Sequence, residues 1–278
     1  MTASKSPTPL LFLASFGLLA LGTIIWWSRD TGSSFSLAPS LAKLPAAMRQ
    51  AAPVAPVQAN WISPLRRSCD VLDQKQRQHL HMLLADLRQS PGRVKVDPSN
   101  YGERFRQDAF GNPVDPTPQL VVLHETVYGI ASAINTFVTK HPRDDDQVSY
   151  HALIGGDGAV IKLLDPSKRA FGAGNSAFNG QWVVTNPNVG GSINNFGLHV
   201  SLETPLDGED NDSEHSGYSA AQYDALAVVL AEWMARFQIR PENITTHKYV
   251  DLGGERSDPR SFNWQALQER LQNLGLLC

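Results

Sequence analysis

Ile244-Thr-Thr-His247-Lys-Tyr-Val-Asp251-Leu-Gly-Gly-Glu-Arg256-Ser-Asp258-Pro259 is the stretch on which the organisation of this 278-residue chain depends. A short β-branched run ends at His247. The Gly-Gly pair that follows allows the loop to fold back, because glycine adopts positive φ at little steric cost. This return can bring Asp258 close to His247. An imidazole and a carboxylate are two of the three protein ligands of an open catalytic zinc site, so the stretch indicates a metal site that needs one more ligand.

The best candidate for the third ligand is His124, which ends the apolar run Leu120-Val-Val-Leu. That run predicts a short buried strand, and sites in α/β sheets tend to be built at the carboxyl ends of strands. Spacing alone leaves two interpretations of His124 and His247 open. They are either metal ligands or ordinary polar residues at strand ends.

Five motifs follow one another in the order of a known family. They are Val121-Val-Leu-His124, Ser149-Tyr-His151-Ala-Leu-Ile154 with Asp157-Gly158, Lys168-Arg-Ala-Phe-Gly-Ala-Gly174, Asn195-Phe-Gly-Leu-His-Val-Ser-Leu-Glu203, and Ile244-Thr-Thr-His247 ahead of Ser257-Asp258-Pro259. Through these motifs, residues from about 119 to 271 resemble the zinc-dependent N-acetylmuramoyl-L-alanine amidases of type 2, which are related to peptidoglycan recognition proteins. The resemblance implies that His124, His247 and Asp258 bind one Zn²⁺.

The resemblance also implies a substrate. An amidase of this family cuts the bond between the lactyl group of N-acetylmuramic acid and L-alanine of the stem peptide, in peptidoglycan or in muropeptides. The alternative is a peptidoglycan-binding module on the same fold, and such relatives commonly lack the third ligand. Asp258 is present here, which favours the enzyme. The predicted substrate contacts are His151, Asn175 and His199.

The chain departs from the family pattern at three positions. The family's lysine two residues before the aspartate ligand is Arg256, which keeps the positive charge that an oxyanion needs. The family's catalytic carboxylate falls on Ser201, and its histidine after Ala-aromatic falls on Gly172. Because positions 201 and 203 face the same side of a strand, we predict that Glu203 takes the proton-transfer role, with Tyr150 as the second candidate. Otherwise Glu203 is a strand-end charge and Arg256 a solvated surface charge.

The N-terminal residues predict a membrane anchor. Pro9 to Trp27 is an uncharged apolar run of nineteen residues, close to the roughly 20 that span a bilayer as a helix. Trp26-Trp27 would lie at the interface. We expect an uncleaved, single-pass signal anchor in residues 1–28 that places the catalytic domain outside the cytoplasm of a bacterium; a cleaved secretion signal is the alternative. Residues 29–65 have the Ala/Pro/Ser-rich composition of a flexible linker.

Residues 66–278 are predicted to form one domain of mixed α/β class, with helices packed on a central mixed β-sheet, like the amidases and peptidoglycan recognition proteins. The predicted elements are a helix over Asp70–Arg88 capped by Asp70 or Ser68, a loop over Pro98–Pro118, a strand ending at His124, a helix over Gly129–Thr139, a hairpin over Tyr150–Leu164, a strand over Asn195–Glu203, a helix over Gln222–Phe237 capped by Ser219, and a helix over Trp264–Leu274.

Charge and cysteine content limit the partners and the compartment. The formal net charge of -3 offers no basic surplus for nucleic acid, and we expect a monomer. The chain has two cysteines, Cys69 and Cys278. They can pair in an exported domain and tie the first helix to the chain end, but the sequence leaves the pairing open.

Overall fold

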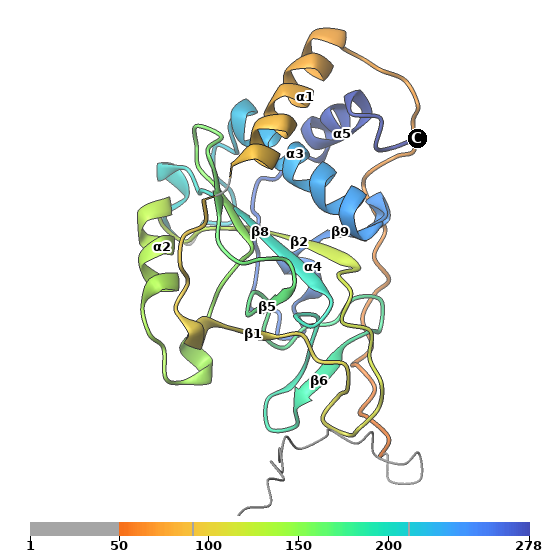
Figure 1. The fold of residues 1–278 in the computed structure, drawn as a ribbon, viewed down its shortest axis with the longest axis vertical. Helices are drawn as coiled ribbons and strands as arrows, with labels where there is room; N and C mark the ends of the chain where they lie inside the picture. The colour runs from red at the N-terminus through yellow and green to blue at the C-terminus, as the bar shows by residue number, and fades with distance from the viewer. Residues whose placement is uncertain (1–49, 91, 211) are drawn as a thin grey trace, which may run out of the picture. The chain divides into compact units, whose positions relative to one another are not determined.

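The computed structural model describes residues 50–90, 92–210 and 212–278, which are built around a five-stranded sheet (Figure 1). Its strands are Leu120–Glu125 (β2), Ala152–Ile154 (β3), Val160–Lys162 (β4), Gly197–Leu202 (β8) and Ile244–Thr246 (β9). They lie in the order β4-β3-β8-β2-β9. All neighbours are parallel except β4, which is antiparallel to β3. The sheet is mixed, as the sequence predicts, and the predicted hairpin is confirmed as β3 and β4.

Three helices form a layer on one face of this sheet: α1 (Gln74–Gln89), α3 (Ala220–Phe237) and α5 (Trp264–Asn273) (Figure 1). Both α1 and α5 contact α3. On the other face, α2 (Ile130–Val138) packs through Phe137 against Leu153. The single-turn helix α4 (His247–Val250) follows β9 directly. Short 3₁₀ helices lie at Pro98–Asn100, Asp144–Asp146, Leu206–Gly208 and Pro241–Asn243.

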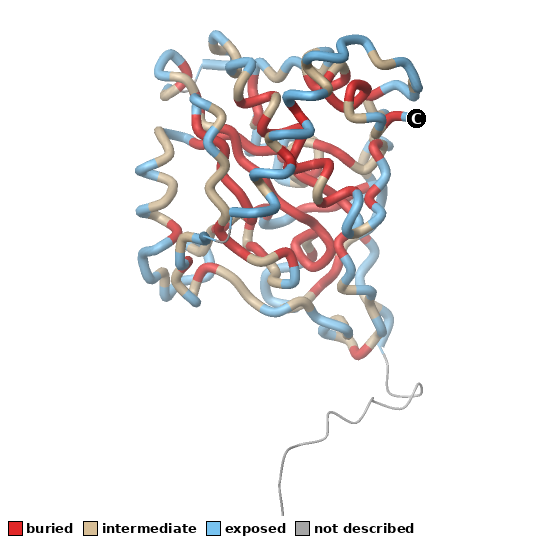
Figure 2. Tube along the Cα trace, turned by 45° about the horizontal axis from the view of Figure 1, so that its top comes forward, coloured by how far each residue is buried: buried red, intermediate tan, exposed pale blue. Residues whose placement is uncertain are grey.

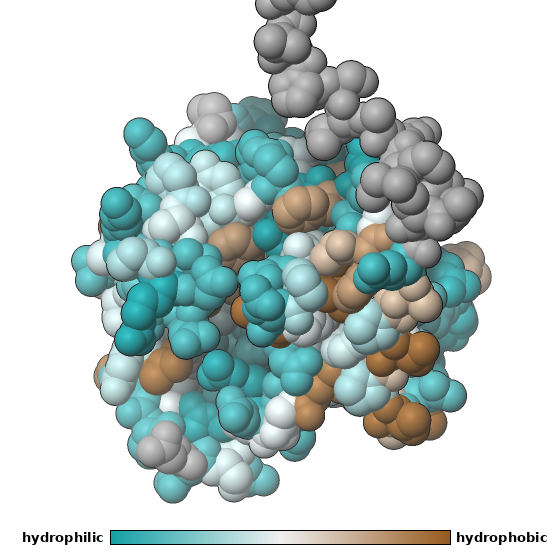
Figure 3. Space-filling model, turned by 90° about the horizontal axis from the view of Figure 1, so that it is seen from below, coloured by the Kyte–Doolittle hydropathy of each residue, from teal (hydrophilic) through white to brown (hydrophobic). Residues whose placement is uncertain are grey.

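The two central strands are buried on both faces, which explains the continuous apolar run at the start of β2. Every residue of β2 and β8 is buried. Because side chains alternate along a strand, Val121 and Leu123 of β2 enter the core under α3, whereas Leu120 and Val122 enter the core on the other face. Figure 2 shows the buried chain, in red, at the centre of the fold, and the face in Figure 3 is mostly hydrophilic.

Two small sheets are additions to the predicted elements. β1 (Tyr101–Glu103) pairs with β5 (Lys168–Ala170), and β6 (Val183–Asn186) pairs with β7 (Gly190–Ser192). β1 lies in the segment predicted as a loop, so that prediction is wrong for these residues. The four strands are three or four residues long and carry no apolar alternation, so they become strands through pairing. β1 pairs with the distant β5, whereas β6 and β7 are joined by a short turn.

The two helix starts differ in how well the sequence predicts them. Ser219 caps α3 by accepting a hydrogen bond from the backbone N–H of Gln222, as predicted. Helix α1 begins later than predicted, because its cap is Asp73 and neither Asp70 nor Ser68. The preceding residues are held extended by the chain end: the backbone N–H groups of residues 72 and 73 donate to the side-chain oxygen of Asn273.

The disulfide that the sequence left open forms between Cys69 and Cys278, whose Cα atoms are 4.4 Å apart. It joins the segment before α1 to the C-terminal residue. The bond therefore closes most of the described chain into one loop, with a sequence separation of 209 residues.

The described part of the predicted linker, residues 50–65, packs on the domain. The Trp61 ring lies 4.6 Å from that of Tyr249 and 5.9 Å from that of Trp264, and Leu65 belongs to the core under α3. The packed domain thus begins before residue 66. The predicted membrane anchor, residues 1–28, lies outside the described residues. Within the described ranges, no helix combines the length and apolarity needed to span a bilayer.

Candidate metal centre and its cleft

The two histidine ligands come from the ends of neighbouring parallel strands. His124 lies near the end of β2, and His247 directly follows β9, which pairs with β2. Parallel strands bring their carboxyl ends to the same edge of a sheet, where sites in α/β folds are built. The topology therefore places both imidazoles at one edge.

Asp258 reaches this edge from a loop that folds back, as predicted. Gly254 has a φ of 70°, a left-handed conformation that favours glycine. The carboxylate of Asp251 holds the turn by accepting hydrogen bonds from backbone N–H groups of Gly253, Glu255 and Arg256. The backbone N–H of Lys248 then donates to the carbonyl oxygen of Asp258 at 2.9 Å. These bonds fix the third ligand beside α4.

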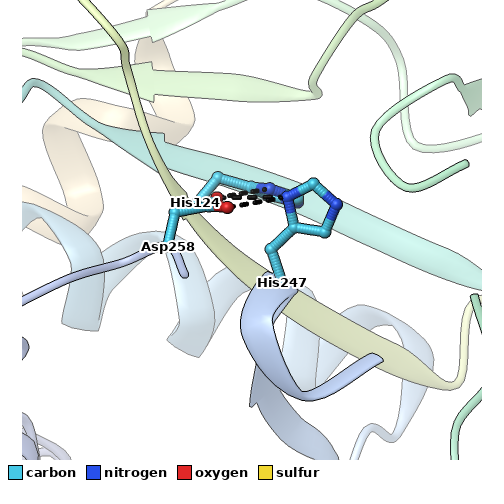
Figure 4. A group of neighbouring side chains, drawn as sticks. All are labelled: His124, His247 and Asp258. Carbon is cyan, nitrogen blue, oxygen red and sulfur yellow. Dashed lines mark hydrogen bonds and ion pairs between the residues drawn. The ribbon is translucent and has the colours of Figure 1, made fainter. Parts of the chain in front are cut away.

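The three side chains converge on one point (Figure 4). Nδ1 of His124 lies 3.2 Å from Oδ2 of Asp258, and Nδ1 of His247 lies 3.2 Å from Oδ2 and 3.0 Å from Oδ1. One ligand atom from each residue lies within 4.8 Å of the other two. Ligand atoms around a tetrahedral zinc at about 2.0–2.1 Å are separated by about 3.3 Å. The spacing and the donor set of two imidazoles and one carboxylate fit zinc, with a fourth position left for water or substrate.

The charges at the centre suit metal binding. Burial, and then the charge of His247, lower the pKa of His124 to about 4. Burial alone would raise the pKa of Asp258, but its hydrogen bonds with His124 and His247 outweigh this and hold that pKa well below its usual value. At neutral pH His124 is neutral and Asp258 ionised. These are the forms that bind a metal ion.

A buried ion pair between Glu125 and Arg260 lies beside the ligands and is a feature of the site that the sequence analysis misses. Glu125 accepts hydrogen bonds from Nε of Arg260 at 2.5 Å and from its backbone N–H at 2.9 Å. Glu125 follows His124 and Arg260 comes two residues after Asp258, so the pair joins two segments that carry ligands. A carboxylate directly after a ligand in an apolar strand is the signal that points to it.

A second cluster behind the centre consists of buried histidines. Nε2 of His124 lies 3.0 Å from Nδ1 of His199, and the backbone N–H of His199 donates to Nδ1 of His151 at 3.0 Å. The side chains of His151 and His199 are both buried. Their predicted contact with substrate stays a prediction that this placement does not support.

A cleft of about 1000 Å³ opens over the centre, and His247 and Asp258 belong to its wall. Among the predicted site residues, Tyr150, Asn175 and Arg256 also line it. The Tyr150 ring stacks on that of His124 with the ring centres 4.5 Å apart. Burial, followed by the nearby charge of Asp258, raises the pKa of the Tyr150 hydroxyl. The structure thus brings together the three ligands and three further predicted residues.

Glu203 is placed differently. One carboxylate oxygen accepts a hydrogen bond from the backbone N–H of Ile130 at 2.8 Å, at the start of α2, and the other from that of Gly156 at 2.7 Å. The residue is not part of the cleft wall. Its predicted role in proton transfer stays a prediction that this placement does not support. Ser201, at the position of the family's carboxylate, is fully buried.

Comparison with known proteins finds a family of amidases whose match contains the three ligand positions. Residues 113–261 match the family described as N-acetylmuramoyl-L-alanine amidase. The chain is 26% identical over 164 residues to the N-acetylmuramoyl-L-alanine amidase AmiD of Escherichia coli, covering 56% of this chain and 54% of AmiD. It is 28% identical over 173 residues to the 1,6-anhydro-N-acetylmuramyl-L-alanine amidase AmpD of Citrobacter freundii, covering 62% of this chain and 73% of AmpD. The chain therefore spans about half the length of the E. coli relative.

Two solved structures are also similar. A selenomethionine derivative of AmpD has 23% identity and a TM-score of 0.49, covering 65% of this chain and 95% of that one. A complex of E. coli AmiD with the substrate anhydro-N-acetylmuramic acid-L-Ala-D-gamma-Glu-L-Lys has 22% identity and a TM-score of 0.44, covering 62% and 65%. The family match spans more than half of the 278 residues and includes all three ligand positions, so the chain belongs to the N-acetylmuramoyl-L-alanine amidase family.

Proposed function

We propose that this chain is a zinc-dependent hydrolase of the amide bond between N-acetylmuramic acid and the L-alanine of peptidoglycan stem peptides. The observation that carries the proposal is the convergence of His124, His247 and Asp258 on one point in the wall of a cleft. Family membership supplies the bond that is cut. The cleft, at about 1000 Å³, has room for a sugar and part of a peptide.

Zinc held by these residues supplies Lewis-acid activation of water and of a carbonyl group. The chain's own groups stabilise the charge that develops on the substrate. Arg256 brings a positive charge to the cleft wall, and a guanidinium does not give up its proton. The Tyr150 hydroxyl is protonated at neutral pH, as an ordinary tyrosine is, and its raised pKa keeps it so at higher pH, so it can donate a hydrogen bond there.

Proton transfer requires a group that reaches the cleft. Ser201 is buried and Glu203 is bound to two backbone amides. We therefore favour Tyr150, alone or with a water molecule, as the group that transfers a proton to the leaving amine. Its place on the His124 ring, beside the ligand atoms, supports this assignment.

The binding-only alternative makes a different prediction for the same sample. Zinc-loaded protein incubated with a muramyl peptide should release a free stem peptide that begins with L-alanine, which mass spectrometry identifies by its mass. Saturable binding of the muramyl peptide with no such product would overturn the proposed activity. The presence of the third ligand, Asp258, within 3.2 Å of both histidines favours hydrolysis.

We also propose that the domain works outside the cytoplasm, held to the membrane by residues 1–28. The disulfide between Cys69 and Cys278 supports this location, because such bonds persist in oxidising compartments. Protease added to intact spheroplasts should degrade the domain. A domain that survives this treatment, yet is degraded after lysis, would contradict the proposed location.

A further inference from the structure

We propose that His199 is a positioning residue for zinc: it fixes the ring of His124 so that Nδ1 faces the metal. This inference rests on the proposed zinc-dependent function and adds a residue to it. His124 uses its two ring nitrogens for two purposes. Nδ1 faces Asp258 at 3.2 Å, whereas Nε2 lies 3.0 Å from Nδ1 of His199, in the core behind the centre.

The direction of this hydrogen bond follows from the chemistry of metal binding. Nδ1 of His124 can bind a metal only through its lone pair, so the ring proton must be on Nε2. That N–H then donates to Nδ1 of His199, which accepts when its own proton is on Nε2. Metal-bound histidines commonly donate their second ring N–H to such a partner, which sets tautomer and orientation.

The burial of His199 also points to this role. Its side chain is fully buried, and its Nε2 has no hydrogen-bond partner among the described residues. Buried polar groups are normally fully bonded. The His199 ring makes one hydrogen bond among the described residues, and its partner is the metal ligand His124. Holding that ligand accounts for a polar side chain at this buried position.

Gly172 provides the space that the His199 ring needs. A Cβ atom at position 172 would lie 2.4 Å from Cγ and Nδ1 of His199, far inside van der Waals contact. The φ of Gly172 is outside the left-handed region, so the backbone does not require glycine here. The space that the His199 ring occupies is therefore the reason for a glycine at position 172. The two residues therefore act together: His199 orients His124, and Gly172 leaves room for the His199 ring.

The experiment measures the zinc dissociation constant of the folded domain by competition with a chelator. His199→Leu removes the acceptor at similar volume and should weaken zinc binding about 10–100-fold. His199→Gln restores an acceptor and should recover part of this loss. Gly172→Ala keeps both histidines but must displace the ring, so it should also weaken binding.

Val200→Ala is the matched control. Val200 is fully buried in the same strand, but its side chain enters the core under α3, on the other face of the sheet. It should lower the unfolding free energy of the zinc-free protein without weakening zinc binding beyond about threefold, well short of the loss expected for His199→Leu.

The outcomes separate this inference from the proposed function. If the wild-type protein binds no zinc, the proposed function fails. If it binds zinc and folded His199→Leu binds equally well, or if His199→Gln is no better than His199→Leu, the positioning role is overturned. The same holds if Val200→Ala loses as much affinity as His199→Leu.

Discussion

At the scale of single residues, the metal centre depends on side chains that neighbour the ligands as much as on the ligands themselves. The buried pair of Glu125 and Arg260 joins the two chain segments that carry His124 and Asp258. Breaking such a pair by removing one partner leaves an uncompensated charge, which is strongly destabilising. The position of the aspartate ligand is therefore held by a contact that neither ligand makes itself.

The departures from the family pattern have local explanations at this scale. The loss of a histidine at Gly172 accompanies the presence of an imidazole at His199, which occupies the space beside it. The loss of the carboxylate at Ser201 is not compensated in the same way, because the side chain of Glu203 caps α2 and the turn at Gly156.

Glu203→Gln tests the role of this carboxylate. The amide can accept one of the two hydrogen bonds but offers an NH₂ group to the second backbone N–H. We expect the unfolding free energy to fall by about 1–2 kcal/mol, while hydrolysis of a muramyl peptide stays within about threefold of wild type, too small a change for a lost general base. A fall in activity of about 10² or more, with zinc and fold retained, would assign Glu203 to proton transfer instead.

At the scale of elements, the sequence predicts what local pattern determines. The predicted strand that ends at His124 is an apolar run, and in the one predicted over Asn195–Glu203 an apolar residue stands at every second position of β8. The helix after Ser219 has both its cap and its apolar face, so all three elements are found. β1 and β5 are missed because their three-residue sequences become strands only through pairing.

The same distinction applies to the site. The ligands carry a signal in residue type and motif order, and the Gly253-Gly254 return is visible in the sequence. The contact of His199 with His124 is not, because it depends on register. Ser201 pairs directly with His124, and His199 pairs with Val122, so the two histidines meet diagonally across strands. Register is a property of the folded sheet.

The disulfide links the segment before α1 to the segment after α5, and we expect its removal to lower the unfolding free energy. Replacing Cys69 and Cys278 together by serine frees a loop closed over 209 residues. The unfolding free energy, measured by urea denaturation, should fall by about 2–4 kcal/mol. Reductant should destabilise the wild type by a similar amount and leave the double variant unchanged. Equal stability of the oxidised wild type and the double variant would contradict the prediction that the disulfide stabilises the fold.

At the scale of the whole molecule, the helix layer that stabilises the sheet and the metal centre occupy different parts of the fold. The layer of α1, α3 and α5 covers one face of the sheet, and the metal centre lies where the carboxyl ends of β2 and β9 meet. The histidines His124, His151 and His199 are fully or almost fully buried in the interior. Burial lowers the pKa of all three, to about 4 for His124 and about 3 for His151.

These pKa shifts predict how stability depends on pH in the zinc-free protein. A histidine whose folded pKa is depressed takes up its proton in the unfolded chain first, near pH 6.5. The stability it contributes is complete above that pH and is lost as pH falls toward the folded pKa. His151→Gln should therefore reduce the loss of unfolding free energy between pH 5.5 and 4.5 by about 1.4 kcal/mol per pH unit. The matched control is His81→Gln, at an exposed position of α1. Equal slopes for the two variants would contradict the prediction.

The most direct test of the central claim is the zinc content of the purified domain. Wild-type protein should retain close to one zinc per chain after dialysis, because His124, His247 and Asp258 supply three ligands at suitable spacing. His247→Ala, folded and dialysed in parallel with the exposed control His81→Ala, should lose the metal together with hydrolysis of a muramyl peptide. Near-stoichiometric zinc retained in His247→Ala would show that the metal centre lies elsewhere and would contradict the account.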